Sequence, residues 1–201
     1  MSRRILLVAL AAFCLALGAV QRPVNAATRT TFTVRSTFQS NLAAFATDDY
    51  GPASGYPSGF AIYNNATMSA FFNQTDYFTT GFSNLNIIQG GQNYCAGCNG
   101  SYRLDFNTTT FTVGGVGVFG VGVDIQANDA TVPYVAFVTY GDSTTENFPL
   151  PVGASFFGIT SPTLIKSIHM GLANGVATTS GSFVIDNLTI GRAAAAGTTV
   201  P

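Results

Sequence analysis

A succession of short β-branched and aromatic runs, beginning near residue 60, most constrains what this chain can fold into. Glycine, proline and asparagine separate the runs, which cover residues 60–63, 68–72, 85–89, 102–106, 116–125, 134–140, 145–150, 155–159, 164–172 and 182–190. Many short strands with turn residues between them are typical of an all-β sandwich. We therefore expect an all-β fold made of two antiparallel layers.

The clearest hairpin joins residues 134–140 to residues 143–150. Gly141 and Asp142 lie between the arms, and a glycine first in a two-residue loop predicts a type II′ turn. In the first arm one face carries Tyr134, Ala136, Val138 and Tyr140, and the other carries Val135, Phe137 and Thr139. Both faces are apolar enough for a strand inside a two-layer sandwich.

Residues 114–123 alternate glycine with valine and phenylalanine. A phosphate-binding loop needs a helix start and usually a lysine, and this run has neither. The alternation instead predicts a strand that a neighbouring layer approaches closely.

A single helix is expected before the strands. Ser36 and Gln39 have capping-box spacing, and Phe38, Leu42 and Phe45 fall on one helical face. Residues 48–52 end this helix, which we expect to pack against the sandwich.

The first 26 residues have the pattern of a secretory signal peptide. Arg3 and Arg4 precede an uncharged run over residues 5–20, and small residues lead to a cleavage site after Ala26. The alternative, a membrane anchor, needs about 20 apolar residues, which this run lacks. We expect a sandwich domain over residues 27–191, a small-residue tail over residues 192–201, and export through the general secretory pathway.

Charge excludes two classes of partner. After residue 26 the chain has five basic and nine acidic residues, a net charge of −4. Binding to nucleic acid or to an anionic membrane surface requires clustered basic residues, so neither partner is expected.

Cys95 and Cys98 form a Cys-x-x-Cys pair within glycine-rich sequence. A redox pair or half of a zinc site are the alternatives for this spacing. The chain has no second pair and one histidine, which is a poor ligand set for structural zinc. In an oxidising compartment we expect a local disulfide that pins a loop.

Four segments together resemble exported bacterial proteins of the PEP-CTERM type: residues 134–142, 156–159, 167–172 and 182–189. The resemblance covers about residues 31–191. It implies a jelly-roll β-sandwich of the galactose-binding-like or carbohydrate-module-like kind, with one short N-terminal helix. In that family a sorting tail with a Pro-Glu-Pro signature follows the domain, whereas this sequence ends at Val200-Pro201. Either a tail that would attach the protein to a membrane is missing, or the protein is secreted.

The resemblance implies a non-enzymatic protein of the cell surface or of an exopolysaccharide-rich matrix. His169 lies between Ile168 and Met170 in a strand, with no nucleophile elbow, so we do not expect serine catalysis. A glycan hydrolase is a weaker alternative, because glycoside hydrolysis needs two nearby carboxylates. The candidates are Asp105, Asp124, Asp142 and Glu146.

The resemblance also implies a structural calcium ion. Carbohydrate-module-like sandwiches hold one with an aspartate of the last strand and oxygens of the first segment, which here are Asp186, Asp49 and Asp48. Strict alternation places Asp186 on one face with Val184 and Leu188, where an ionised carboxylate needs a partner. The alternative is that Asp186 accepts backbone N–H groups at a bulge near Asn187.

Carbohydrate binding is the principal alternative function. A sugar platform needs exposed aromatic faces beside hydrogen-bonding groups. The chain has eight tyrosines and no tryptophan. Tyr134 and Tyr140 are the expected glycan contacts, and extracellular polysaccharide is the expected partner. The opposing interpretation is that these tyrosines lie at strand ends with their hydroxyls in water.

Overall fold

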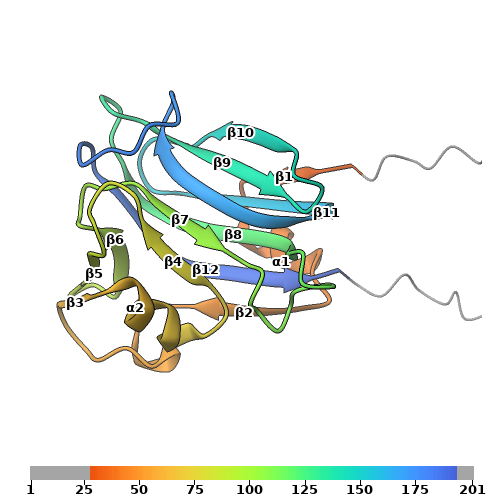
Figure 1. Cartoon of the computed structure of the whole chain (residues 1–201), viewed down its shortest axis with the longest axis horizontal. Helices are drawn as coiled ribbons and strands as arrows, with labels where there is room; N and C mark the ends of the chain where they lie inside the picture. The colour runs from red at the N-terminus through yellow and green to blue at the C-terminus, as the bar shows by residue number, and fades with distance from the viewer. Residues whose placement is uncertain (1–27, 194–201) are drawn as a thin grey trace, which may run out of the picture.

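The computed structural model describes residues 28–193 (Figure 1). Two short α-helices occur in this range, α1 (Arg35–Ser40) and α2 (Asn65–Phe72), with a 3₁₀ turn at Pro52–Ser54. The remaining elements are strands: β1 (Thr30–Phe32), β2 (Ala44–Asp48), β3 (Ala61–Tyr63), β4 (Asp76–Thr79), β5 (Asn86–Gln89), β6 (Asn93–Ala96), β7 (Tyr102–Asp105), β8 (Val118–Asn128), β9 (Tyr134–Tyr140), β10 (Thr145–Pro149), β11 (Ser155–Leu172) and β12 (Phe183–Arg192).

The strands form an open antiparallel sandwich, which confirms the expected all-β class. Layer one contains β1, the first part of β11, β8, β12 and β2, and it continues through β6, β5 and β3. Layer two contains β10, β9, the second part of β11, β7 and β4. β11 passes from one layer to the other near Leu164, where φ is 62° and the pairing register shifts. In Figure 1, β4 and β7 cross in front of β8 and β12.

The core lies between the layers and is rich in tyrosine. Alternate residues of β9, namely Tyr134, Ala136, Val138 and Tyr140, are fully buried. They pack against inward-facing aliphatic side chains of β8, β11 and β12. Because both layers contribute apolar faces, residues far apart in the sequence form one continuous core.

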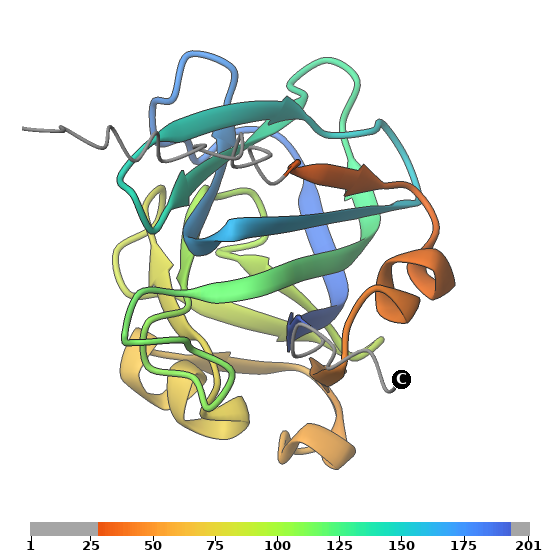
Figure 2. The ribbon, with the colours of Figure 1, turned by 90° about the vertical axis from the view of Figure 1, so that its right-hand side faces the viewer.

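Helix α1 lies on the outer side of layer one, away from β4 and β9 (Figure 2). Its Phe38 lies against Gly120 and Gly122 of β8 and Gly158 of β11, and Leu42, just after the helix, lies against Gly191 of β12. Gly122 is paired with Gly158, and Gly120 with Gly191. A Cβ at Gly122 would lie 2.8 Å from Cε1 of Phe38, and one at Gly120 would lie 2.6 Å from Cδ2 of Leu42. The glycine-rich run is a strand only from Val118 onward, and the group that lies close to its glycines is this helix rather than a neighbouring layer.

The helix prediction was wrong in its length and cap. Helix α1 ends at Ser40, Val34 takes the N-cap position without a side-chain hydrogen bond, and Phe45 lies in β2. β2 pairs with β12 from Asp48 to Ala44, and this pairing outweighs the helical spacing of Phe45.

The strand expected over residues 68–72 is a second helix. The side chain of Asn64 caps α2 by accepting the Thr67 N–H at 2.8 Å. Helix α2 runs along the free edge of β4, where the Tyr77 N–H donates to Ser69 Oγ at 2.9 Å. A helix that covers an edge strand satisfies backbone groups that would otherwise be open to pairing.

The β9–β10 hairpin is present, but its turn differs from the expected type II′. The Ser143 N–H donates to the Tyr140 carbonyl at 2.9 Å, and Ser143 has a φ of 66°. A turn followed by a residue with a left-handed backbone is the pattern of a three-residue hairpin loop, so this loop is longer than the expected two-residue type. Only glycine fits at position 141, since a Cβ there would lie 2.8 Å from the Thr163 carbonyl oxygen.

The expected signal peptide, its cleavage site and most of the expected tail lie outside the described residues. β12 extends to Arg192, one residue beyond the expected domain boundary. Within residues 28–193, neither helix has the length and apolar content that a membrane span requires.

Candidate functional site

The last strand contains a bulge that changes which residues face the core. Asn187 has a φ of 49°, and the pairing with β8 shifts between Asp186 and Thr189. An extra residue in one strand reverses the alternation beyond it. Leu188 therefore lies in the core with Ile185 and Ile190, while Asp186 points to the outer face of layer one. Strict alternation had wrongly placed Asp186 and Leu188 together.

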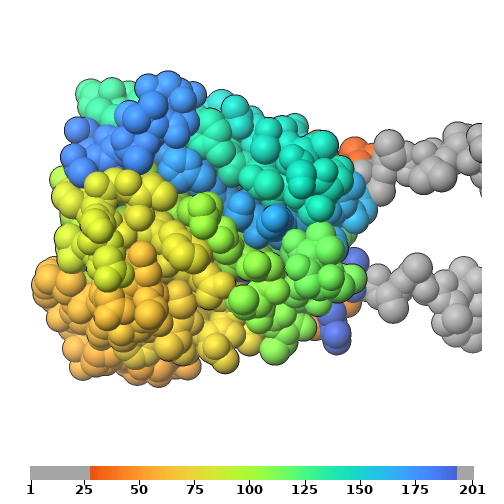
Figure 3. Space-filling view, in the orientation of Figure 1, coloured from red at the N-terminus to blue at the C-terminus, as the bar shows by residue number. Residues whose placement is uncertain are grey.

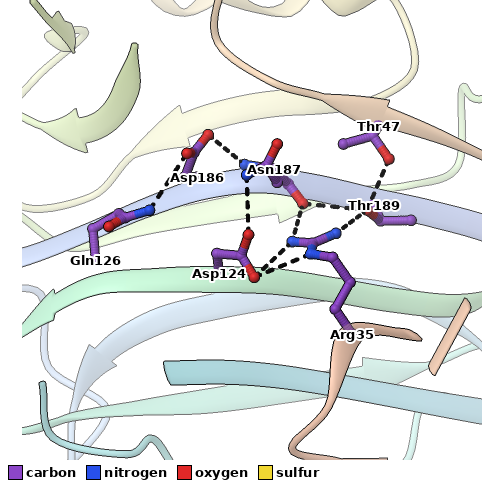
Figure 4. Close-up of polar contacts among 7 residues, drawn as sticks. All are labelled: Arg35, Thr47, Asp124, Gln126, Asp186, Asn187 and Thr189. Atoms are coloured by element: carbon purple, nitrogen blue, oxygen red, sulfur yellow. Dashed lines mark hydrogen bonds and ion pairs between the residues drawn. The ribbon is translucent and has the colours of Figure 1, made fainter. Parts of the chain in front are cut away.

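Asp186 is half-buried and has a backbone partner. Its Oδ1 accepts the Asn187 N–H at 2.7 Å, and its Oδ2 accepts a longer bond of 3.4 Å from Gln126 (Figure 4). This is the bulge arrangement considered as the alternative to calcium. Burial raises the pKa of Asp186, the nearby Asp124 carboxylate raises it further, and the Asn187 N–H opposes both.

Arg35, the first residue of α1, joins the helix to β8 and β12 (Figure 4). Its Nε donates to Asp124 Oδ1 at 3.1 Å, Nη1 donates to Thr189 Oγ1 at 2.7 Å, and Nη2 donates to the Asn187 carbonyl at 2.8 Å. The other Asp124 oxygen accepts Asn187 Nδ2 at 3.0 Å. We call Arg35, Asp124, Asp186, Asn187 and Thr189 the Arg35 cluster. Arg35 and Asp124 form an ion pair within it, which suits fastening a helix.

Asp48 lies in a separate, fully buried cluster. Its Oδ2 accepts the hydroxyls of Tyr77 at 2.8 Å and Tyr56 at 2.9 Å, and its Oδ1 accepts the Tyr50 N–H at 3.1 Å. The Tyr50 and Tyr77 hydroxyls are also hydrogen-bonded, at 3.1 Å. Burial raises the pKa of Asp48 to about 6, against the opposing effect of the hydrogen bonds. We call these four residues the Asp48 cluster.

The structure does not assemble the expected calcium ligands. Asp48 faces the tyrosines of its cluster, Asp49 accepts the Gly51 N–H at 3.0 Å, and Asp186 faces outward from β12. Within the described range, no three acidic, histidine or cysteine side chains are grouped as a metal ion would require. The inward turn of Asp48 into its tyrosine cluster separates it from Asp186, which faces outward.

Tyr134 and Tyr140 offer no ring face to a sugar. Both are fully buried, with the Tyr134 ring stacked on Phe183 and the Tyr140 hydroxyl donating to Glu146 at 2.9 Å. Their assignment as glycan contacts was wrong, because they occupy the core face of β9. The outward face carries Phe137 instead.

Cys95 and Cys98 lie at disulfide-bonding distance, as expected. Cys95 is buried in β6, and the pair closes a four-residue turn in which Gly97 and Cys98 both have left-handed backbones. The bond therefore pins the end of β6.

Each residue considered for hydrolysis is already bound by other groups of the protein. Asp124 binds Arg35, Asp105 binds Arg103, and Asp142 accepts the Thr144 N–H in the β9–β10 turn. Glu146 binds Arg29 and Tyr140. His169 is on the outer face of layer two, where Nε2 lies 3.2 Å from Thr80 Oγ1, and burial lowers its pKa.

A groove of about 540 Å³ runs between α2 and β4. Asn65, Asn73 and Asn84 line it together with Asp76 and the half-exposed Phe78. The sequence interpretation missed this groove because it assigned residues 68–72 to a strand. It also missed Arg35, although the scarcity of basic residues was a usable signal.

No protein-family model, curated protein or solved structure matches this chain. Its function must therefore be argued from its own residues.

Proposed function

We propose that this chain is an exported, non-catalytic β-sandwich that works at the cell surface or in the extracellular matrix. The observation that carries the proposal is the placement of the ends of the fold. The start of β1 and the end of β12 lie at the same end of the sandwich, with β5 and β6 at the other (Figure 1). A domain connected through one end leaves its sheet faces and its far end free for contacts.

The polar clusters support a structural or binding role. The Arg35 cluster fastens α1 to the sheet, and the Asp48 cluster joins β2 to β4 through Tyr77. A short disulfide in β6 suits an oxidising compartment. Charged residues make up 8% of the chain, so its outer faces depend on hydroxyl and amide groups.

Carbohydrate binding is a second candidate, favoured by the groove beside α2. Amide side chains with a carboxylate and a half-exposed ring are the groups that hold a sugar. Calcium is not part of this second proposal, since residues 28–193 contain no group of three acidic, histidine or cysteine side chains that could hold a metal ion.

Fractionation of the producing cells tests the principal proposal. We expect the native protein in the envelope or extracellular matrix fraction and accessible to added protease on intact cells. Recovery only in the cytoplasmic fraction, protected from protease until lysis, would contradict it.

A further inference from the structure

Five side chains form a straight row across the outer face of layer two. The register pairs Asn147 with Phe137, Phe137 with His169, His169 with Arg103, and Arg103 with Phe78. Phe137, His169 and Arg103 each lie between two buried neighbours on their strands, and Asn147 and Phe78 are themselves exposed, so all five point outward. We call this set the planar row.

Planar groups lie next to one another along this row. The Phe137 and His169 rings are stacked with centroids 5.7 Å apart and an interplanar angle of 29°. The Arg103 guanidinium lies 4.7 Å from the Phe78 ring centroid. A Cβ at Gly171 would lie 2.7 Å from Cε1 of His169, so glycine leaves room for the imidazole against the sheet.

A second row of hydrogen-bonding groups runs beside the first. Its members lie two positions away from the planar row on each strand. The same strand pairings place Thr145 opposite Thr139, Thr139 opposite Ser167, Ser167 opposite Asp105, and Asp105 opposite Asp76. Residues two apart on a strand are separated by about 6.6 Å, so the rows lie side by side. Ser167 is buried, whereas the other four are partly or fully exposed. We call this set the polar row.

The charges of this face select against a polyanion. The two rows contain one arginine and two aspartates, and Arg103 is paired with Asp105 at 2.8 Å. Burial lowers the pKa of His169, and nearby Arg103 lowers it further, so the imidazole is neutral at pH 7. An uncharged ligand with many hydroxyl groups complements this face.

We propose, resting on carbohydrate binding as the second candidate function, that the planar and polar rows bind an extended chain of a neutral polysaccharide, with sugar rings on Phe137, His169 and Phe78 and sugar hydroxyls bonded to the exposed members of the polar row. Neighbouring strands are about 4.8 Å apart, so five strands give a track of about 19 Å. At its β4 end the track meets the groove beside α2, which Asp76 and Phe78 also line. Figure 3 shows the β4, β7, β9 and β11 regions at the molecular surface on this side.

Affinity electrophoresis tests the proposal with the full chain. Native gels would contain a mixed-linkage β-glucan, a galactomannan, dextran or the acidic polymer alginate. We expect retardation by at least one neutral polysaccharide and none by alginate. Phe78→Ala and Phe137→Ala should each weaken binding about tenfold.

Phe60→Ala is the matched control, because Phe60 is 65% exposed and lies next to β3 in layer one. It should bind like the parent. Thr139→Arg keeps both rings and places a long side chain across the track, so it should abolish binding. This variant guards against misfolding of the ring variants as the cause of their weaker binding. No retardation by any neutral polymer, or an equal loss in Phe60→Ala, would overturn the proposal. Such a result would leave the surface location of the protein unaffected, because location is measured separately.

Discussion

Asp48 is the one fully buried acidic residue in the described part of the chain. Its carboxylate is fully buried and accepts only neutral donors, and its pKa is raised from 3.8 to about 6. The folded state therefore holds the proton more tightly than the unfolded state. The contribution to stability is complete below about pH 4 and declines as the pH rises to about 6, by on the order of 3 kcal/mol.

Asp48→Asn should remove most of this pH dependence. An amide keeps the shape of the carboxylate and does not ionise, so the free energy of unfolding should become flatter between pH 4 and pH 6. Asp186, whose pKa is also raised, leaves a residual slope of the same sign. Urea denaturation across this range measures the effect.

The control is Asp129→Asn. Thr131 holds the pKa of Asp129 below its usual value through backbone and side-chain hydrogen bonds, so Asp129 titrates below the window in question. The variant should keep the slope of the parent. An unchanged slope in Asp48→Asn would contradict the assignment.

Residue-level predictions from the sequence succeeded where alternation was unbroken. The faces of β9 were separated correctly, yet both are apolar, so the pattern did not show which one is buried. β9 pairs with β11 in layer two, so one face of β9 covers the core and the other, which carries Phe137, points outward. Asp186 was misplaced relative to Leu188 because the bulge at Asn187 has no strong sequence signal.

At the scale of elements, the packing of α1 on the sheet depends on glycines in the strands of layer one. Gly122→Ala would place a Cβ 2.7 Å from Cζ of Phe156 and 2.8 Å from Cε1 of Phe38. We expect a loss of about 1–3 kcal/mol in unfolding free energy from overpacking. Gly90→Ala, with open space around it and no left-handed backbone, is the control and should change stability little. Equal losses of stability in the two variants would show that close packing of Phe38 on Gly122 is not the cause.

Arg35 is the polar fastening of the same helix. Arg35→Met removes the partners of Asp124 and Thr189 while keeping most of the side-chain volume. We expect a loss on the order of 2 kcal/mol and faster amide exchange in α1. Arg192→Met, at the exposed end of β12, should behave like the parent in hydrogen–deuterium exchange. Unchanged protection of the α1 amides in Arg35→Met would show that packing of the helix on the strand glycines is enough to hold it.

Most long strands could be predicted from the sequence, and several short elements could not. β1, β2, β4 and β6 were missed because three to five residues give little periodicity. Helix α2 was read as a strand because Met68, Phe71 and Phe72 are as apolar as strand residues, and the Asn64 cap was overlooked. The two expected strands at residues 155–159 and 164–172 are one bent strand, β11.

At the scale of the whole molecule, the disulfide makes a limited contribution to stability. A bond that closes a four-residue ring stabilises by about 2 kcal/mol in the chain-entropy account. Reducing agent should lower the stability of the parent by that amount and leave the Cys95→Ala/Cys98→Ala double variant unchanged. Guanidinium denaturation with and without reductant provides the measurement. Reductant sensitivity of the double variant would contradict the assignment.

The overall class was predictable because many short apolar runs allow few architectures other than a sandwich. The candidate glycan surface was not, because it exists only through the register of five strands. Phe78, Arg103, Phe137, His169 and Asn147 are separated by as many as 91 positions in the sequence, and none forms a motif with another.

The account as a whole rests on export, and the N-terminus of the native protein tests it most directly. The protein would be recovered from the medium and the cell surface, and its first residues determined by sequencing or intact mass. The account predicts an extracellular protein that begins at Ala27. A protein that retains Met1 and is recovered only from inside the cell would contradict it.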